Sequence, residues 1–249
     1  MDLGLKDKIA LVTGTGSQKG FGKTIALTLA KEGCDIISSD INLEGAEQTA
    51  AEVRALGRKA IALKADIRSR QEVDSMVKEA LEEFGHIDIL VNNAGTPGMV
   101  PPTSEESWDI NVNINMKGTW YVTNAVIPQM QERRYGKIVN LASSLARSGA
   151  PTLYAAAKSG IVGLTKMYAK QLGPMGINVN GVAPGMGDTG FQDIVGATEE
   201  QKQWFISKVP MRRITSNEDI ANTVAFLASD VSVDITGQTI QVDGGDYMW

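Results

Sequence analysis

Residues 9–22 read Ile-Ala-Leu-Val-Thr-Gly-Thr-Gly-Ser-Gln-Lys-Gly-Phe-Gly. An apolar run enters a turn rich in glycine, and a helical pattern begins near residue 20. Where side chains are missing, backbone N–H groups at the start of a helix can approach a pyrophosphate, whose negative charge the helix dipole favours. A glycine-rich turn can equally be an ordinary link between a strand and a helix, so the rest of the chain has to separate the two interpretations.

Short apolar runs alternate with longer amphipathic stretches from one end of the chain to the other, which is typical of βαβ units around a parallel sheet. Seven strands are expected, at residues 9–13, 35–39, 60–64, 87–91, 137–141, 178–182 and 239–242. Helical patterns lie near residues 20–32, 43–56, 69–84, 104–132, 152–172 and 217–229. The sequence predicts one α/β domain, residues 1–249, with a doubly wound, mostly parallel seven-stranded sheet flanked by helices. Ligands of such sheets bind outside the carboxyl ends of the strands.

Composition excludes several classes of function. The 249 residues carry 24 basic and 29 acidic side chains, a net charge of −5, with no block of like charges. We therefore expect no nucleic-acid partner and no membrane partner, and no apolar run approaches the roughly 20 residues of a membrane span. One cysteine, Cys34, and one histidine, His86, cannot build a thiolate or histidine-rich metal site, so no metal is expected. The first twenty residues lack a secretion-signal pattern, and a cytoplasmic location is expected.

Asp40 stands at the end of the second predicted strand, 18 residues beyond Gly22. A carboxylate in this position can accept hydrogen bonds from both ribose hydroxyls of an adenosine and repel a 2′-phosphate. The alternative is that Asp40 caps the next helix. Lys19, a basic residue inside the glycine-rich turn, acts in the opposite direction because it can attract a phosphate.

Tyr154 and Lys158 stand four residues apart in a helical stretch, so both project from one face. They follow residues 141–144, Leu-Ala-Ser-Ser, which come after a predicted strand and so belong on the side of the glycine-rich turn. A tyrosine with a pKa near 10 is a poor base at pH 7, and lowering that pKa by about three units takes about 4 kcal/mol. A neighbouring ammonium can supply much of this stabilisation, and a serine hydroxyl can hold a carbonyl oxygen in line for protonation.

These segments occur in the same order as further short motifs: Asp66 after the third strand, Asn92-Asn93-Ala94-Gly95 after the fourth, Asn115-Met116-Lys117-Gly118, Pro184-Gly185 and Asp243-Gly244-Gly245. In this order they resemble the short-chain dehydrogenase/reductase family over residues 6–245. The resemblance implies a Rossmann-like domain that transfers hydride between a nicotinamide and a carbonyl or secondary alcohol, usually as a homotetramer or homodimer.

The resemblance also implies roles for individual residues. Tyr154 would be the general acid/base, and Lys158 would lower its pKa and bind the nicotinamide ribose. Ser143 would orient the substrate oxygen, and Asn115 would hold a water that links Lys158 to solvent. The implied cofactor-binding residues are Gly14, Ser17, Gly20, Phe21, Asp40, Asp66, Ile67, Asn93, Ala94, Gly95, Tyr154, Lys158, Pro184, Gly185 and Thr189. Among them, Asp66 would receive the adenine amino group, and Thr189 would approach the carboxamide.

The chain departs from the family pattern in three places. Five residues rather than three separate Gly14 from Gly20, so Gly14 fits the strand register whereas Gly16 fits the spacing. Because the interval before Tyr154 is slightly short, Ser144 is an alternative to Ser143. Gly187 stands where the family commonly has isoleucine or valine. Residues 186–213 break the strand–helix rhythm of this chain, and this segment is expected to cover the substrate as a lid.

Apolar side chains of that segment either line a substrate pocket or pack the lid on the body and on a neighbouring subunit; they are Phe191, Ile194, Val195, Trp204, Phe205 and Ile206. Arg147 either meets an anionic substrate group or is solvated, and the ending Met248-Trp249 is expected in a subunit interface. The leading interpretation is an NAD-dependent oxidoreductase of secondary alcohols or ketones. The alternatives are a 3-oxoacyl-thioester reductase of the same family and a catalytically silent NAD-binding sensor or subunit.

Overall fold

The computed structural model describes residues 2–96, 103–187, 189 and 198–248. Within them, one sheet contains β1 (Ile9–Thr13), β2 (Asp35–Asp40), β3 (Ala60–Lys64), β4 (Ile89–Asn92), β5 (Gly136–Leu141), β6 (Ile177–Pro184) and β7 (Thr239–Val242). The strand order is β3-β2-β1-β4-β5-β6-β7, and neighbouring strands pair in parallel. The predicted Rossmann-like α/β fold is therefore confirmed.

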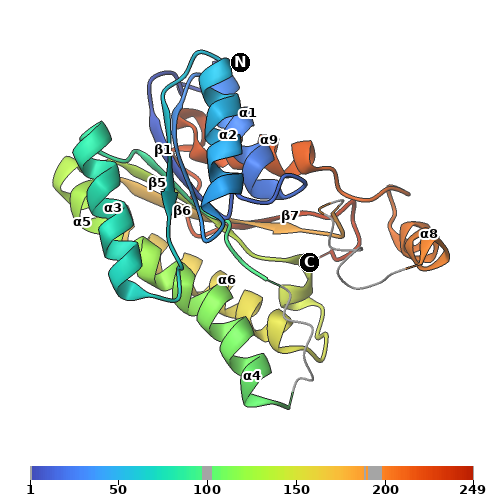
Figure 1. Cartoon of the computed structure of the whole chain (residues 1–249). Coiled ribbons are helices and arrows are strands. Elements are labelled where there is room, and N and C mark those ends of the chain that lie inside the picture. The colour runs from blue at the N-terminus through green and yellow to red at the C-terminus, as the bar shows by residue number, and fades with distance from the viewer. Residues whose placement is uncertain (1, 97–102, 188, 190–197, 249) are drawn as a thin grey trace.

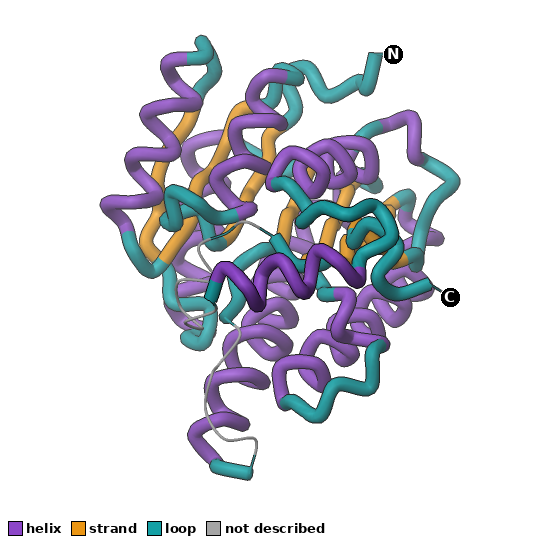
Figure 2. The backbone as a smooth tube through the Cα atoms, turned by 90° about the vertical axis from the view of Figure 1, so that its right-hand side faces the viewer, coloured by secondary structure: helices purple, strands orange, loops and turns teal. Residues whose placement is uncertain are grey.

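Most strand residues are buried because both faces of the sheet are covered, although β2, β5 and β6 also carry polar side chains. Alternate residues of one strand enter opposite cores: Val12 of β1 packs in the core on one face, and Leu11 packs in the core on the other. Helices α1, α2 and α9 cover the first face, and α3, α5 and α6 cover the second (Figure 1). In Figure 2, where α8 faces the viewer, the strands lie between these two layers.

The helices are α1 (Phe21–Lys31), α2 (Leu43–Ala55), α3 (Arg70–Phe84), α4 (Glu105–Trp108), α5 (Thr119–Arg133), α6 (Leu153–Leu172), α8 (Glu199–Lys208) and α9 (Asn217–Ala228). Short 3₁₀ turns occupy η2 (Ser144–Arg147), η3 (Gly173–Met175) and η4 (Asp230–Ser232). In the described part of the chain, no helix combines the length and the apolar character needed to cross a membrane.

The continuous helix predicted near residues 104–132 is wrong in one respect, because α4 and α5 are separated by a π-helical segment, η1 (Asp109–Gly118). Amide side chains bond to backbone carbonyls there: Asn111 Nδ2 lies 2.9 Å from the Ser107 oxygen, and Asn115 Nδ2 lies 3.0 Å from the Asn111 oxygen. Such local widening of a helix is frequent at functional sites. The segment carries Asn115 to the carboxyl ends of the strands.

The chain builds the sheet outward from β1 in both directions: β2 pairs with one edge of β1, and β4 pairs with the other. Helices α1 and α2, which follow β1 and β2, cover one face, whereas α5, which follows β4, covers the other, and this leaves a crevice at the carboxyl ends. The loops after β1, β2 and β4 therefore meet at one edge of the sheet.

Candidate active site

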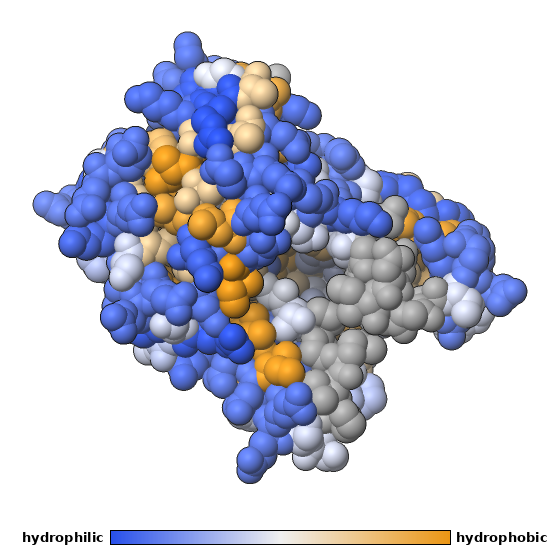
Figure 3. All heavy atoms as spheres, viewed as in Figure 1, coloured by the Kyte–Doolittle hydropathy of each residue, from blue (hydrophilic) through white to orange (hydrophobic). Residues whose placement is uncertain are grey.

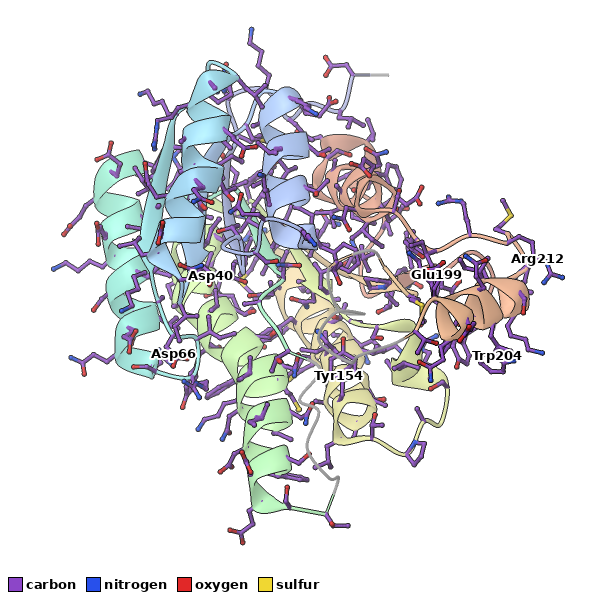
Figure 4. All side chains as sticks on the ribbon, turned by 45° about the vertical axis from the view of Figure 1, so that its right-hand side comes forward. Asp40, Asp66, Tyr154, Glu199, Trp204 and Arg212 are labelled. Atoms are coloured by element: carbon purple, nitrogen blue, oxygen red, sulfur yellow. The ribbon has the colours of Figure 1, made fainter. Side chains whose placement is uncertain are left out.

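A cleft of about 940 Å³ lies at the carboxyl ends of the strands. Segments that follow β1 to β6 line it, together with α8 and the C-terminal tail. Every residue to which the family resemblance assigned a role lines this cleft except Asn115, which is buried behind it. Figure 4 shows Asp40 and Asp66 on one side of the strand ends, with Tyr154 between them and α8. The fold thus brings the expected residues together at the carboxyl ends of the strands.

Gly14 begins the glycine loop with a positive φ of 75°, and its N–H donates to the Ser39 carbonyl over 2.7 Å. A Cβ on Gly14 would lie 2.7 Å from the Cα of Ala94, and one on Gly22 would lie 2.1 Å from the Gly14 oxygen. These contacts require glycine where strand, loop and helix meet. Gly14 lines the cleft, whereas Gly16 packs against Asp40 outside the lining.

Asp40 ends β2 with a half-buried carboxylate that two backbone groups hold. Its Oδ2 accepts from the Gly16 N–H over 2.8 Å, and its Oδ1 accepts from the Asn42 N–H over 2.9 Å. The N-cap of α2 is Asn42, whose side chain accepts from the Gly45 N–H. The alternative role of Asp40 as the helix cap is therefore wrong.

Asp66 follows β3 and shares the cleft wall with Ile67 and Arg68. Both carboxylate oxygens of Asp66 lie 2.9 Å from Arg68 Nε, and this hydrogen-bonded guanidinium lowers the pKa of Asp66. Sequence reasoning missed Arg68. A basic residue two positions after the expected adenine-binding carboxylate is the signal that was available.

Asn93 secures the glycine loop to the end of β4. Its Nδ2 donates to the carbonyls of Thr13 and Gly14 over 2.9 and 3.0 Å, while the Thr13 hydroxyl accepts from the N–H groups of Asn93 and Ala94 over 3.1 Å each. Thr13 also lines the cleft and was absent from the expected set. Its place as the last residue of β1 is the feature that points to it.

Tyr154 and Lys158 project from the first turns of α6, whose N-cap Thr152 accepts from the Ala155 N–H over 3.1 Å. Lys158 is 5% exposed, and its Nζ donates to the Leu141 carbonyl over 2.7 Å. The same nitrogen lies 5.6 Å from the centre of the Tyr154 ring. The end of β5 and the start of α6 thus fix the ammonium beside the phenol.

Asn115 and Lys158 both approach Gly95. A Cβ on Gly95 would lie 2.6 Å from Asn115 Oδ1 and 3.3 Å from Lys158 Nζ, so both side chains converge on this glycine. Thr96 fixes the Asn115 amide, donating to Oδ1 over 3.2 Å and accepting from Nδ2 over 2.8 Å. The π-helical segment η1 thus contributes Asn115 to the surroundings of Lys158.

Ser143 and Ser144 both line the cleft after β5. The Ser143 hydroxyl accepts from the Leu145 N–H over 3.2 Å and is a hydrogen-bond partner of the Tyr154 side chain. That partnership lowers the pKa of Tyr154. Of the two candidate serines, Ser143 is the hydrogen-bond partner of the phenol.

Burial dominates the electrostatics of the reactive pair. It raises the pKa of Tyr154 to about 12 despite the Ser143 hydroxyl, and it lowers the pKa of Lys158 to about 8. Both shifts favour the neutral form, as expected where water is excluded. The Tyr154 pKa is therefore raised, whereas the neighbouring ammonium alone was expected to lower it.

The expected lid, residues 186–213, lies partly outside the described residues, and so do Phe191, Ile194, Val195 and Trp249. Phe205 of α8 lines the cleft, whereas Trp204 is 58% exposed and Ile206 is half-buried outside the lining. Thr189 lines the cleft as expected. Arg147 is exposed at the end of η2, outside the lining.

Gly187 has a local reason to be glycine. A Cβ there would lie 2.5 Å from the ring of Phe21, so the space that isoleucine or valine fills in the family is taken by an aromatic side chain at the start of α1. Asp246 and Tyr247 of the tail also line the cleft and were not expected there. Asp243 holds the tail in place, because its carboxylate accepts from the N–H groups of Gly245 and Tyr247 over 3.0 Å each.

Comparison with known proteins gives consistent results. Residues 14–246 match the family model described as enoyl-(acyl carrier protein) reductase. The chain is 42% identical over 246 residues to the (2S)-[(R)-hydroxy(phenyl)methyl]succinyl-CoA dehydrogenase subunit BbsD of Thauera aromatica, covering 98% of each chain. It is 41% identical over 246 residues to the 3-oxoacyl-[acyl-carrier-protein] reductase FabG of Staphylococcus aureus, covering 97% of this chain and 98% of the relative.

Among solved structures, a 7α-hydroxysteroid dehydrogenase complexed with NADH and 7-oxo glycochenodeoxycholic acid matches with a TM-score of 0.92 and 34% identity, over 98% of this chain and 96% of the other. Fold, family model and relatives agree over nearly the whole length. The chain therefore belongs to the short-chain dehydrogenase/reductase family and is a nicotinamide-dependent oxidoreductase.

Proposed function

We propose that this oxidoreductase transfers hydride between NAD(H) and a secondary alcohol or ketone, with Tyr154 as the general acid/base. The observation that carries the proposal is the convergence of Tyr154, Lys158 and Ser143 in one cleft that extends to Asp40 at its other end. Tyr154 offers a proton, Lys158 an ammonium beside the phenol, and Ser143 a hydroxyl for the substrate oxygen. A silent sensor or subunit needs no such set, so the complete constellation favours the enzyme.

Three features of the cleft suit a dinucleotide: glycines in its wall, the N-terminus of α1 and the residues around the place that we assign to the nicotinamide. Glycines at residues 14, 20 and 95 leave backbone in the cleft wall where a side chain would stand, and the loop 14–20 leads into the N-terminus of α1. That terminus favours a pyrophosphate. When bound, the nicotinamide supplies or accepts the hydride. Phe21, Pro184, Gly185 and Thr189 line the part of the cleft that we assign to this ring.

The residues of the chain handle the proton. Ser143 holds the substrate oxygen, and Tyr154 donates its phenolic proton to that oxygen during reduction or accepts it during oxidation. Lys158 uses one donor on the Leu141 carbonyl, which leaves its others for the nicotinamide ribose. Asn115, buried beside Lys158, would hold the water through which the ammonium exchanges protons with solvent.

The pKa of Tyr154 determines whether the phenol can act as an acid in reduction or as a base in oxidation. A phenol with a pKa of about 12 is protonated at neutral pH and ready to act as an acid for ketone reduction. The positive charge of an oxidised nicotinamide favours the phenolate. Oxidation of an alcohol therefore gains rate as the pH rises and the phenolate forms.

We assign NAD rather than NADP as the cofactor because Asp40 lies where an adenosine ribose would bind. Like charges disfavour a 2′-phosphate there by about 4 kcal/mol per pair at 4 Å with an effective dielectric near 20, before salt screening. Asp66 and Ile67, with Asn93 to Gly95, line the part of the cleft that we assign to the adenosine.

A 3-oxoacyl thioester is the second candidate substrate. The observation that favours it is that two relatives above 40% identity are named for thioester substrates, one of coenzyme A and one of an acyl carrier protein. The test is an absorbance assay at the NADH band with matched panels of simple ketones and 3-oxoacyl thioesters. Turnover in either panel supports the enzyme and chooses its class, and no turnover in both would contradict the proposal.

We further propose one domain that assembles as a homo-oligomer, a tetramer or a dimer, in the cytoplasm. The support for assembly is exposed apolar surface at Trp108, Trp120 and Met167, and Figure 3 shows apolar side chains in a band across an otherwise hydrophilic face. Met248 of the tail is 78% exposed and suits a subunit interface. A reducing compartment suits Cys34, a buried free thiol.

A further inference from the structure

The glycine loop is two residues longer than the family pattern, and its middle part contacts α2 rather than the cleft. Thr15 is fully buried: its Oγ1 lies 2.7 Å from the Ser38 hydroxyl, and its carbonyl accepts from Thr49 Oγ1 over 2.9 Å. Neither Thr15 nor Gly16 lines the cleft, whereas Ser17 does. The added length therefore enters the space between β2 and α2 before it returns to the ligand.

Gly16 is in direct contact with the Asp40 carboxylate. Its N–H donates to Oδ2 over 2.8 Å, and a Cβ on Gly16 would lie 2.7 Å from Asp40 Cγ and 3.0 Å from its Oδ1. These separations are shorter than the optimum of about 3.5 Å between carbon atoms. A side chain at position 16 must therefore displace the carboxylate, although the φ of Gly16 lies outside the left-handed region.

Gln18 fixes the loop from the outside. Its Nε2 donates to the carbonyls of Gly45 and Gly16 over 3.0 and 3.3 Å. Its Oε1 accepts from Lys23 Nζ over 2.8 Å, and the same nitrogen lies 2.7 Å from Glu52. The loop is thus docked on α2 through Gly45 and Glu52 and on α1 through Lys23.

We propose that Gly16 and Gln18 form a clamp that positions Asp40 and thereby sets the choice between a ribose 2′-hydroxyl and a 2′-phosphate. This inference rests on the proposed use of NAD. Gly16 touches the carboxylate, Gln18 holds the Gly16 carbonyl, and neither lines the cleft, so both are positioning residues that act through Asp40. The longer loop thereby holds the Asp40 carboxylate at the place that we assign to the adenosine ribose.

Two variants test the clamp. Gly16→Ala adds the atom that collides with the carboxylate, and Gln18→Ala removes hydrogen bonds without adding an atom. Gly163→Ala is the control, because a Cβ there meets nothing within 4 Å and Gly163 lies on the exposed face of α6. Fluorescence titration then gives the Kd of each protein for NADH, NADPH and reduced nicotinamide mononucleotide, which lacks the adenosine.

We expect Gly16→Ala to raise the Kd for NADH about tenfold, which corresponds to about one hydrogen bond to a charged group. The Kd for the mononucleotide should match that of Gly163→Ala, and the ratio of the NADPH Kd to the NADH Kd should fall. Gln18→Ala should shift both quantities in the same direction by a smaller factor. If Gly16→Ala fails to fold, the Gln18→Ala titrations decide alone.

Unchanged NADH affinity in both variants would overturn the clamp. Equal losses of NADH and mononucleotide affinity would overturn it as well, because they would show a general structural effect. Failure of the proposed cofactor choice looks different: unmodified protein would then bind NADPH as tightly as NADH, while the loss of NADH affinity relative to the mononucleotide in Gly16→Ala would still report the hold on Asp40.

Discussion

Replacing Lys158 with methionine is expected to stabilise the cofactor-free protein while abolishing its activity. Burial lowers the pKa of Lys158 from its ordinary 10.5 to about 8. At 1.36 kcal/mol per unit, the charged ammonium therefore costs the folded state about 3 kcal/mol at pH 7. Methionine removes this cost but leaves the Leu141 carbonyl without its 2.7 Å donor, a loss of about 1 kcal/mol. The expected net gain in the free energy of unfolding is about 2 kcal/mol.

The gain in the free energy of unfolding from Lys158→Met should decrease as the pH rises. Between about pH 8 and 10.5 the unfolded chain binds more protons at Lys158 than the folded chain, so the unmodified protein becomes more stable as the pH rises through this window. The advantage of Lys158→Met should therefore shrink between pH 8 and pH 10.5. Urea unfolding followed by tryptophan fluorescence at pH 7 and pH 10 measures both values.

Lys166→Met is the matched control, because Lys166 lies on the same helix with an exposed side chain. It should change the free energy of unfolding by less than about 0.5 kcal/mol at either pH. A Lys158→Met protein that is less stable than the unmodified one at pH 7, or whose advantage is the same at pH 10, would refute the reasoning.

The remaining predictions concern turnover and cofactor choice. Tyr154→Phe should lower kcat at least about a hundredfold with little change in NADH affinity by fluorescence titration; retention of more than about a tenth of kcat would move the proton transfer elsewhere. Ser143→Ala should lower kcat far more than Ser144→Ala, because Ser143 is the partner of the phenol, and equal small losses would contradict that assignment. In steady-state assays, the unmodified enzyme should prefer NAD over NADP at least about tenfold in kcat/KM, and Asp40→Ala should narrow the preference. Comparable efficiency with both cofactors would show that Lys19, or the longer loop that carries it, outweighs the carboxylate.

Much of the fold could be predicted because the parallel strands are buried on both faces and appear in the sequence as short apolar runs. The strand at 9–13 and the loop that follows it are examples. Periodicity could not show the π-helical segment at Asp109–Gly118, since polar and apolar residues alternate there one by one, a pattern that indicates no widened helix. The change in winding comes with amide-to-carbonyl bonds of Asn111 and Asn115, which a pattern of apolar residues does not encode.

Some features of the candidate site could likewise be predicted from the sequence, and others could not. The carboxyl-end argument placed Asp40, Asp66 and Tyr154 in one cleft because it depends only on strand order. It could not show that Arg68 already holds Asp66, or that the C-terminal tail brings Asp246 into the cleft wall. Those features depend on side-chain direction and on the path of the tail, and neither has a periodic signal.

We expect the hydride in this cleft to pass directly from the nicotinamide to a carbonyl carbon. The most direct test uses NADH that carries deuterium at C4, in each of its two stereochemical forms, with the ketone or 3-oxoacyl thioester that turns over fastest. Mass spectrometry of the product should find one deuterium on the carbinol carbon from one form of NADH only, and none with Tyr154→Phe in the same time. Product alcohol without deuterium from either form would contradict the account.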